Sequence, residues 1–252
     1  MGVIETGQPN TLKIVVFCLS PLGDALFATP AVRALREKFP KAHILIIATP
    51  VAARILKSNP FLIPVIAVKN HMELFPLLAA IRKYHYDLAV GFSPLGSFLV
   101  RFCKTPLRSD LSMVQADDSL SVVEACLEVL KIIGIHSTST TTEFWISPRE
   151  KIQFEASVNR FIEKQGHHLK KSYIAVHCGG HYFVRKRWPV ANFIELIQQL
   201  GLGGNHQVVL IGGTEDLPEA RLIQAKIPEV LNAVGKLKLV ETAILLSKCS
   251  LM

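Results

Sequence analysis

Short apolar runs alternate with longer helical patterns along the first half of the chain. Each run is rich in Val, Ile or Leu and is bounded by turn or polar residues, which is typical of a buried strand. Four such runs lie at residues 13–18, 43–48, 65–68 and 87–91. Helical periodicity predicts helices over residues 25–39, 74–84 and 120–134. This alternation predicts a mostly parallel sheet covered by helices on both faces.

A polar segment separates this half from a second α/β series. Residues 137–143 read STSTTTE, which predicts a solvated connector without a chemical role. Beyond it we expect strands at residues 173–177 and 207–211, and helices over residues 151–166, 191–200 and 217–226. The pattern therefore predicts two nucleotide-binding-like α/β domains, residues 1–145 and residues 146–252. Ligands in such sheets bind at the carboxyl ends of the strands.

Composition and charge narrow the function classes only in part. The net charge of +8 suits an acidic substrate, an anionic membrane surface or nucleic acid. Nucleic acid fits least, because the cations are not interleaved with base-stacking aromatic residues. The five cysteines lack the spacing of a zinc or redox motif, which predicts reduced thiols in a cytoplasm and no metal site. The N-terminus does not resemble a signal peptide and no apolar run is long enough to span a bilayer, so we expect a soluble protein with at most peripheral membrane contact.

The first candidate site is SPLGD, residues 20–24, directly after the first predicted strand. Ser20 begins the loop, Gly23 permits a tight turn, and Asp24 falls at the start of the next helix. A carboxylate there could cap free backbone N–H groups. Alternatively, Asp24 could act as a general base within hydrogen-bond reach of a substrate hydroxyl.

Two glycine-rich segments follow strands of the second domain. HCGG, residues 177–180, places Gly179 and Gly180 where a ligand could approach the backbone, or where the chain simply turns. His177 by itself is interpreted as a structural histidine. GGTED, residues 212–216, places Glu215 where it could accept hydrogen bonds from ribose hydroxyls or cap the following helix.

A cluster of cations precedes a predicted helix. VRKRWP, residues 184–189, contains Arg185, Lys186 and Arg187 in succession. Three cations beside the positive end of a helix dipole are unfavourable. An anion held between these cations and the free N–H groups would resolve the conflict, so the segment predicts a phosphate or pyrophosphate site.

These motifs together resemble glycosyltransferase family 9, the heptosyltransferase family. The resemblance rests on four stretches in order: LGDALFATPAVRALREKFP, KRWPVANFIELI, VVLIGGTEDLPEA and GKLKLVETAILLSKCSLM. It implies two Rossmann-like domains in the arrangement called GT-B, with the acceptor bound by the first and the nucleotide-sugar donor by the second. It also implies inverting, metal-independent transfer of a heptose-like sugar from an ADP-sugar to a lipopolysaccharide core or a related lipid-linked glycan. The expected location is cytoplasmic, with possible peripheral contact at the inner membrane.

The resemblance also assigns roles to individual residues. Asp24 matches the base that deprotonates the acceptor hydroxyl. Lys186 matches the lysine that neutralises the donor pyrophosphate, and Arg185 lies beside it. Glu215 matches the acidic residue near the donor ribose, while Gly179 and Gly180 fall at the phosphates. No cofactor beyond the nucleotide-sugar substrate is expected.

One departure from the family pattern leaves a second hypothesis open. Family members continue with a loop reading D-[ST]-G-P-x-H that grips the donor, and this sequence stops at Met252 before it. The second domain is therefore expected to be incomplete. A non-catalytic nucleotide-binding fragment is the alternative to an active sugar transferase.

Overall fold

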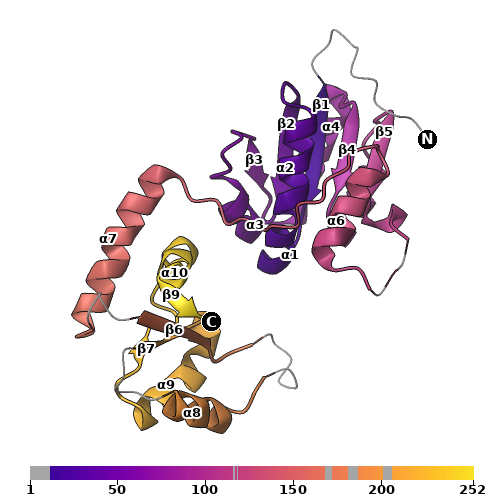
Figure 1. Ribbon diagram of the computed structural model, residues 1–252. Helices are drawn as coiled ribbons and strands as arrows, with labels where there is room; N and C mark the ends of the chain where they lie inside the picture. The colour runs from indigo at the N-terminus through magenta and orange to yellow at the C-terminus, as the bar shows by residue number, and fades with distance from the viewer. Residues whose placement is uncertain (1–11, 116, 118, 168–171, 181–186, 201–205) are drawn as a thin grey trace. The chain divides into compact units, whose positions relative to one another are not determined.

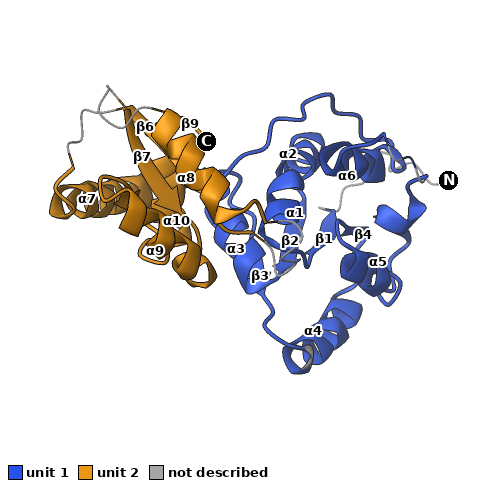
Figure 2. Ribbon diagram, turned by 90° about the horizontal axis from the view of Figure 1, so that it is seen from below, with its two compact units in different colours: residues 1–147 blue, residues 148–252 orange. Residues whose placement is uncertain are grey.

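The computed structural model describes residues 12–115, 117, 119–167, 172–180, 187–200 and 206–252, and only the backbone of His71. The chain divides into two compact units, residues 1–147 and residues 148–252 (Figure 2). The division lies two residues beyond the boundary predicted from the polar connector.

Unit 1 is built on a five-stranded parallel sheet, as far as the chain is described (Figure 1). The strand order is β3-β2-β1-β4-β5, and β1 pairs with β2 from Lys13 opposite His43 to Cys18 opposite Ala48. The central position explains the unbroken apolar run of β1, whose residues from Ile14 onward are fully buried. The strands are β1 (Lys13–Cys18), β2 (His43–Ala48), β3 (Val65–Ala67), β4 (Leu88–Gly91) and β5 (Leu107–Asp110).

Helices cover both faces of this sheet. Because side chains alternate along β1, Val16 packs toward one helical layer and Val15 toward the other. The first layer contains α1 (Leu22–Phe27), α2 (Thr29–Lys38), α3 (Pro50–Leu56) and α6 (Val122–Lys131). The second layer contains α4 (His71–Tyr84) and α5 (Pro94–Val100). A single 3-10 turn, η1 (Leu111–Met113), follows β5 in the described part of the unit.

Unit 2 has a smaller parallel sheet of the same kind. Its described strands follow the order β8-β7-β6-β9, and β6 pairs with β7 along its whole length. The strands are β6 (Ser172–His177), β7 (His206–Ile211), β8 (Leu231–Asn232) and β9 (Cys249–Leu251). The helices are α7 (Pro148–Lys164), α8 (Val190–Gln199), α9 (Leu217–Lys226) and α10 (Leu239–Leu246). A 3-10 turn, η3 (Thr214–Asp216), joins β7 to α9.

The single helix predicted over residues 25–39 is wrong, because the chain forms two helices that meet at Ala28. Pro30 lies in the first turn of α2. Proline has no N–H, so it cannot bond to the carbonyl of Leu26 four residues earlier. The hydroxyl of Thr29 donates to that carbonyl instead, at 2.7 Å.

The sequence pattern missed the shortest elements. Helices α3, α5 and α10 have seven or eight residues, and strands β5, β8 and β9 have two to four. Segments this short do not repeat a helical or strand period often enough to be recognised.

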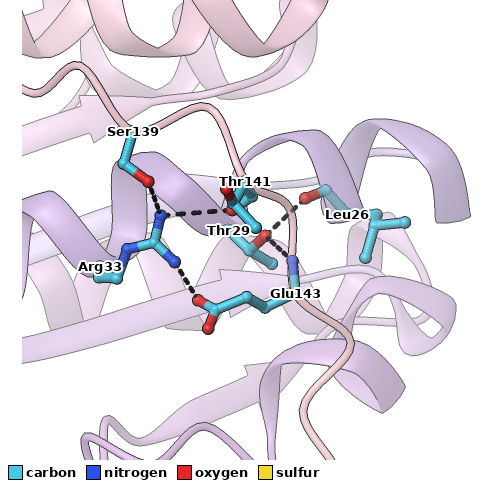
Figure 3. A network of polar contacts seen from close by, with 6 residues as sticks. All are labelled: Leu26, Thr29, Arg33, Ser139, Thr141 and Glu143. Atoms are coloured by element: carbon cyan, nitrogen blue, oxygen red, sulfur yellow. Dashed lines mark hydrogen bonds and ion pairs between the residues drawn. The ribbon is translucent and has the colours of Figure 1, made fainter.

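The segment of residues 137–143 is largely exposed, as its composition predicts, but it is also hydrogen-bonded to unit 1. Figure 3 shows it fastened to α2. Arg33 donates to the Glu143 carboxylate at 2.5 Å and to the Ser139 hydroxyl at 2.7 Å, while the Glu143 N–H donates to the Thr29 hydroxyl at 2.9 Å. Trp145, which follows, is 7% exposed and packs its ring edge-on against Phe61. The chain therefore remains part of unit 1 up to about the domain boundary.

Among the described residues, no helix combines the length and the apolar character needed to cross a membrane.

We predict that Thr29→Val lowers the free energy of unfolding by about 1–3 kcal/mol, measured by urea denaturation. The change keeps the side-chain shape but leaves the Leu26 carbonyl and the Glu143 N–H without their partner. Thr105→Val is the matched control, because the Thr105 hydroxyl is buried and has no hydrogen-bond partner among the described residues. The control should be neutral or slightly stabilising, and equal losses in both variants would contradict the bridging role of Thr29.

Candidate functional site

The loop after β1 is held at the carboxyl edge of the unit 1 sheet. Ser20 is buried, and its carbonyl accepts a hydrogen bond from the Thr49 hydroxyl at 2.8 Å. The same hydroxyl accepts from the N–H of Ala52 at the start of α3. One side chain at the end of β2 therefore fixes both the loop after β1 and the first turn of the next helix.

Asp24 lies in the first turn of α1 and is partly buried. The start of α1 has no side-chain cap, so the capping alternative for Asp24 is wrong. The pKa of the Cys18 thiol is raised to about 11, mainly by burial and in smaller part by the Asp24 carboxylate, against a lowering by the Ser20 hydroxyl. The effect of Asp24 agrees with a position near the end of β1.

Two other described carboxylates near this edge of the sheet are engaged in hydrogen bonds within unit 1. Asp110, at the end of β5, accepts from the N–H and the hydroxyl of Ser112 at 2.9 and 2.5 Å. Glu73, in the first turn of α4, accepts from the Lys69 N–H at 2.9 Å. Asp24 forms no side-chain hydrogen bond with a described residue, so its carboxylate remains available to a ligand.

Gly23 does not serve the tight turn that the sequence predicts. It lies inside α1 with an ordinary helical backbone, and a Cβ built on it would meet no atom within 4 Å. The space above Gly23 is open, one residue before Asp24. The glycine leaves room beside the carboxylate rather than shaping the loop.

The corresponding edge of unit 2 is organised by a residue that the sequence analysis did not single out. Asp216 is 2% exposed, and its Oδ2 accepts from the Gly213 N–H at 3.0 Å and lies 3.2 Å from His177 Nε2. Its Oδ1 is buried without a partner among the described residues. Because a carboxylate accepts but does not donate, His177 carries its proton on Nε2 in this pair. Half of the His177 side chain remains exposed at the end of β6.

The position of Asp216 explains why residue 179 is a glycine. A Cβ on Gly179 would lie 1.7 Å from Asp216 Oδ1. No side chain fits there while the carboxylate keeps its bond to Gly213. Gly179 and Gly180 thus end β6 beside a buried anion, with backbone that a ligand could approach.

Glu215 is exposed, and its side chain folds back over Gly213. Its predicted alternative role as a cap is wrong, since the carboxylate that holds the Gly213 N–H belongs to Asp216. Glu215 forms no hydrogen bond with a described residue.

The predicted anion site before α8 is described only in part. Arg185 and Lys186 lie outside the described residues. Arg187 is described, and its guanidinium donates to the Glu219 carboxylate at 2.6 Å. The start of α8 has no side-chain cap. Arg187 is therefore paired with a residue of α9 in this structure, and the anion site itself stays a prediction.

The predicted residues form two groups, each within one unit. Ser20, Gly23 and Asp24 lie together in unit 1, and Gly179, Gly180 and Glu215 lie at neighbouring strand ends in unit 2. In the described parts of the chain, no group of three or more His, Cys, Asp and Glu residues could hold a metal ion.

The His177–Asp216 pair is the main feature that sequence reasoning missed. His177 lies opposite Ile211 in the paired strands, so the residues that follow β7 lie next to it. The signal was the spacing of three residues between Gly213 and Asp216, which matches a capping interaction. The sequence analysis instead singled out Glu215, as an acidic residue placed to bind ribose hydroxyls.

Comparisons with known proteins identify similar sequences and folds. The family model described as glycosyltransferase family 9 (heptosyltransferase) matches residues 101–252, which is more than half of the chain. A search of curated proteins gives no match.

Among solved structures, the glycosyl transferase family 9 protein from Veillonella parvula matches with a TM-score of 0.78 and 21% identity, over 95% of this chain and 74% of that chain. The ADP-heptose lps heptosyltransferase II of E. coli gives a TM-score of 0.72 and 22% identity, over 94% of this chain and 77% of that chain. The E. coli heptosyltransferase WaaC with ADP gives a TM-score of 0.67 and 16% identity, over 94% of this chain and 79% of that chain. These matches confirm the predicted α/β fold class with Rossmann-like domains.

We predict that Gly179→Ala destabilises the protein by about 1–3 kcal/mol in chemical denaturation, because the new methyl group displaces the Asp216 carboxylate from the Gly213 N–H. Gly23→Ala is the matched control. Alanine favours a helix more than glycine does, so this variant should gain up to about 1 kcal/mol. A Gly179→Ala variant as stable as the wild type would contradict the close packing of Asp216.

We further predict that Asp216→Asn keeps the Nε2–H tautomer of His177. Asp216 Oδ2 faces both the Gly213 N–H and His177 Nε2, so the asparagine must place its amide oxygen there, because its NH2 group could not accept from Gly213. Nitrogen chemical shifts of His177, recorded in alkaline solution where the ring is neutral, report the tautomer directly. A change to the Nδ1–H tautomer would show that the Gly213 N–H does not fix the orientation of this side chain.

Proposed function

The chain belongs to glycosyltransferase family 9, and from this premise we propose that it transfers a heptose-like sugar from an ADP-linked donor to a lipopolysaccharide core or a related glycan. Heptosyltransferase-like glycosyl transfer is the activity of the family whose model matches the chain. Two structures with the same fold are described as an ADP-heptose lps heptosyltransferase and a heptosyltransferase with ADP. These two relatives support the choice of an ADP-sugar donor and a lipopolysaccharide acceptor.

The availability of Asp24 carries the mechanistic proposal. Its neighbours at the carboxyl edge of the sheet, Asp110 and Glu73, are held by hydrogen bonds, whereas Asp24 is not. In the proposed reaction the acceptor hydroxyl passes its proton to Asp24 while its oxygen attacks the anomeric carbon. The bond from that carbon to the ADP oxygen breaks on the opposite side, so the anomeric configuration inverts. Unit 1 would accordingly bind the acceptor, with Ser20 and Gly23 beside the base.

Unit 2 supplies the features that suit a nucleotide-sugar. Gly179 and Gly180 bring glycine backbone to the end of β6, where phosphates bind in folds of this kind. Glu215 is exposed and free to accept from ribose hydroxyls. We assign to Lys186 and Arg185 the stabilisation of the negative charge that develops on the departing ADP. The family resemblance places these residues at the pyrophosphate, and a metal-independent reaction needs cations there.

The proposal extends to location. A lipid-linked acceptor would bring the protein to the cytoplasmic face of the inner membrane without a spanning helix. Nucleic acid is not a proposed partner.

We predict that Asp24→Asn lowers the rate of sugar transfer by about 10²-fold or more, the range expected for loss of a general base. Affinity for ADP, measured by calorimetry, should stay within about twofold, because Asp24 belongs to the acceptor side. Glu37→Gln, an exposed carboxylate near the end of α2, is the matched control and should keep full turnover.

The outcomes separate the active enzyme from the nucleotide-binding alternative. ADP binding without transfer by the wild-type chain would favour the non-catalytic alternative. Unchanged turnover in Asp24→Asn would remove Asp24 from the mechanism and leave the family assignment in place.

A further inference from the structure

Large apolar side chains gather on the outer surface of α4 and α5. Met72 and Phe75, in the first turns of α4, are 84% and 72% exposed. Phe98 of α5 is 55% exposed and packs edge-on against Phe102, with 4.9 Å between the ring centroids. Tyr84 and Leu95 add further exposed apolar surface. We refer to these six side chains as the α4–α5 face.

The six residues belong to a single layer of unit 1. The inner sides of α4 and α5 share one apolar cluster against the sheet. Burial raises the pKa of Cys103 to about 11, and Arg82 of α4 lowers it, so the end of α4 lies close to the turn after α5. Figure 2 shows both helices on the same side of the unit 1 sheet. The exposed residues therefore form parts of one face rather than scattered positions.

The segment that carries the α4–α5 face, residues 69–108, is also strongly basic. Between residues 69 and 108 the sequence has six Lys and Arg residues and two Asp and Glu residues, a net charge of +4 out of +8 for the whole chain. Of the two carboxylates, Glu73 is bonded to the Lys69 N–H and Asp87 to the Lys13 N–H. The cations Arg82, Lys83 and Lys104 are exposed.

The opposite layer is less basic and exposes fewer large apolar side chains. Its helices α1, α2, α3 and α6 with their connecting segments, residues 19–42, 49–64 and 111–135, carry six acidic and seven basic residues, a net charge of +1. The exposed large apolar residues of these helices, Leu22, Phe27 and Val122, are each less than half exposed, and Leu62, in the connection after α3, is 89% exposed. This layer resembles the surface of an ordinary soluble protein, with single apolar residues among mixed charges.

The α4–α5 face also lies next to the edge of the sheet that carries Asp24. In a parallel α/β unit the helices that follow the strands begin at the carboxyl edge. Met72 and Phe75 lie at the start of α4, and Leu95 lies at the start of α5. An acceptor whose lipid part remained in a bilayer touching this face would present its glycan close to Asp24.

We propose that the α4–α5 face docks unit 1 onto the surface of an anionic phospholipid bilayer. This inference deepens the proposed function and rests on it for the lipid-linked acceptor, whereas the surface chemistry stands independently. Met72, Phe75 and Phe98 enter the headgroup–acyl boundary, where aromatic and apolar side chains are favoured, and the surrounding cations meet the negative headgroups. The positive charge argues against a second copy of the chain as the occupant, because two copies of the face would repel each other.

Sedimentation of the full chain with vesicles tests the proposal. The wild type should bind vesicles that contain phosphatidylglycerol and bind vesicles of phosphatidylcholine alone far more weakly, with added salt reducing the difference. Met72→Ser with Phe75→Ser should lower the partition coefficient by about tenfold or more. Arg82→Gln with Lys83→Gln should lower the partition coefficient about fivefold per cation on anionic vesicles, and should leave binding to phosphatidylcholine vesicles unchanged.

Ile152→Ser with Leu222→Ser is the matched control, because these exposed apolar residues lie on α7 and α9 of unit 2. The control should bind like the wild type. Wild-type protein that fails to bind anionic vesicles, or a Met72/Phe75 variant that binds normally, would overturn the proposal. A dimer that dissociates in that variant, seen by analytical ultracentrifugation, would also overturn it by assigning the face to a second copy.

Transfer to a soluble, delipidated acceptor separates this proposal from the proposed function. The docking variants should retain that activity while losing vesicle binding. Vesicle binding by a wild-type chain that transfers no sugar would support the docking surface and contradict the proposed function.

Discussion

Burial of both faces of each parallel sheet is the constraint on which the rest of the structure depends. The central strands β1 and β6 are covered by helices on both sides, so they carry apolar side chains almost without interruption. Polar chemistry is consequently confined to the loops at the strand ends. The loop with Asp24 follows β1, and the glycines and the His177–Asp216 pair follow β6 and β7.

The polar groups at these edges divide into those that hold the backbone and those that remain free. Thr49, Asp110 and Asp216 satisfy N–H groups of neighbouring turns and fix the loop geometry. Asp24 and Glu215 form no hydrogen bond with a described residue. A buried carboxylate without partners is costly, whereas a free carboxylate on an accessible edge is available to a substrate hydroxyl. This division gives the strongest physical reason for placing the acceptor at Asp24 and the donor ribose at Glu215.

The sequence predicted the long buried strands and the longer helices, because their apolar periods repeat often enough to be recognised. It did not predict contacts between segments far apart in the chain. The bonds from Arg33 and Thr29 to residues 139–143 join positions more than a hundred residues apart, so the polar composition predicted the exposure of this segment but not its attachment to α2. Likewise, the contact of Asp216 with His177 depends on the pairing of β6 with β7. The bond from Arg187 to Glu219 depends on the approach of Arg187 to α9. The positions of the motifs were predictable from the sequence. Which of two neighbouring carboxylates, Glu215 or Asp216, accepts from the Gly213 N–H was not.

Inverting transfer of a sugar from a nucleotide is the central claim of this account. Its most direct test is the anomeric configuration of the glycan formed when the wild-type chain is supplied with ADP-heptose and a lipopolysaccharide-core acceptor. We predict a product whose anomeric configuration, determined by NMR, is opposite to that of the donor. A product that retains the donor configuration would contradict direct displacement assisted by Asp24.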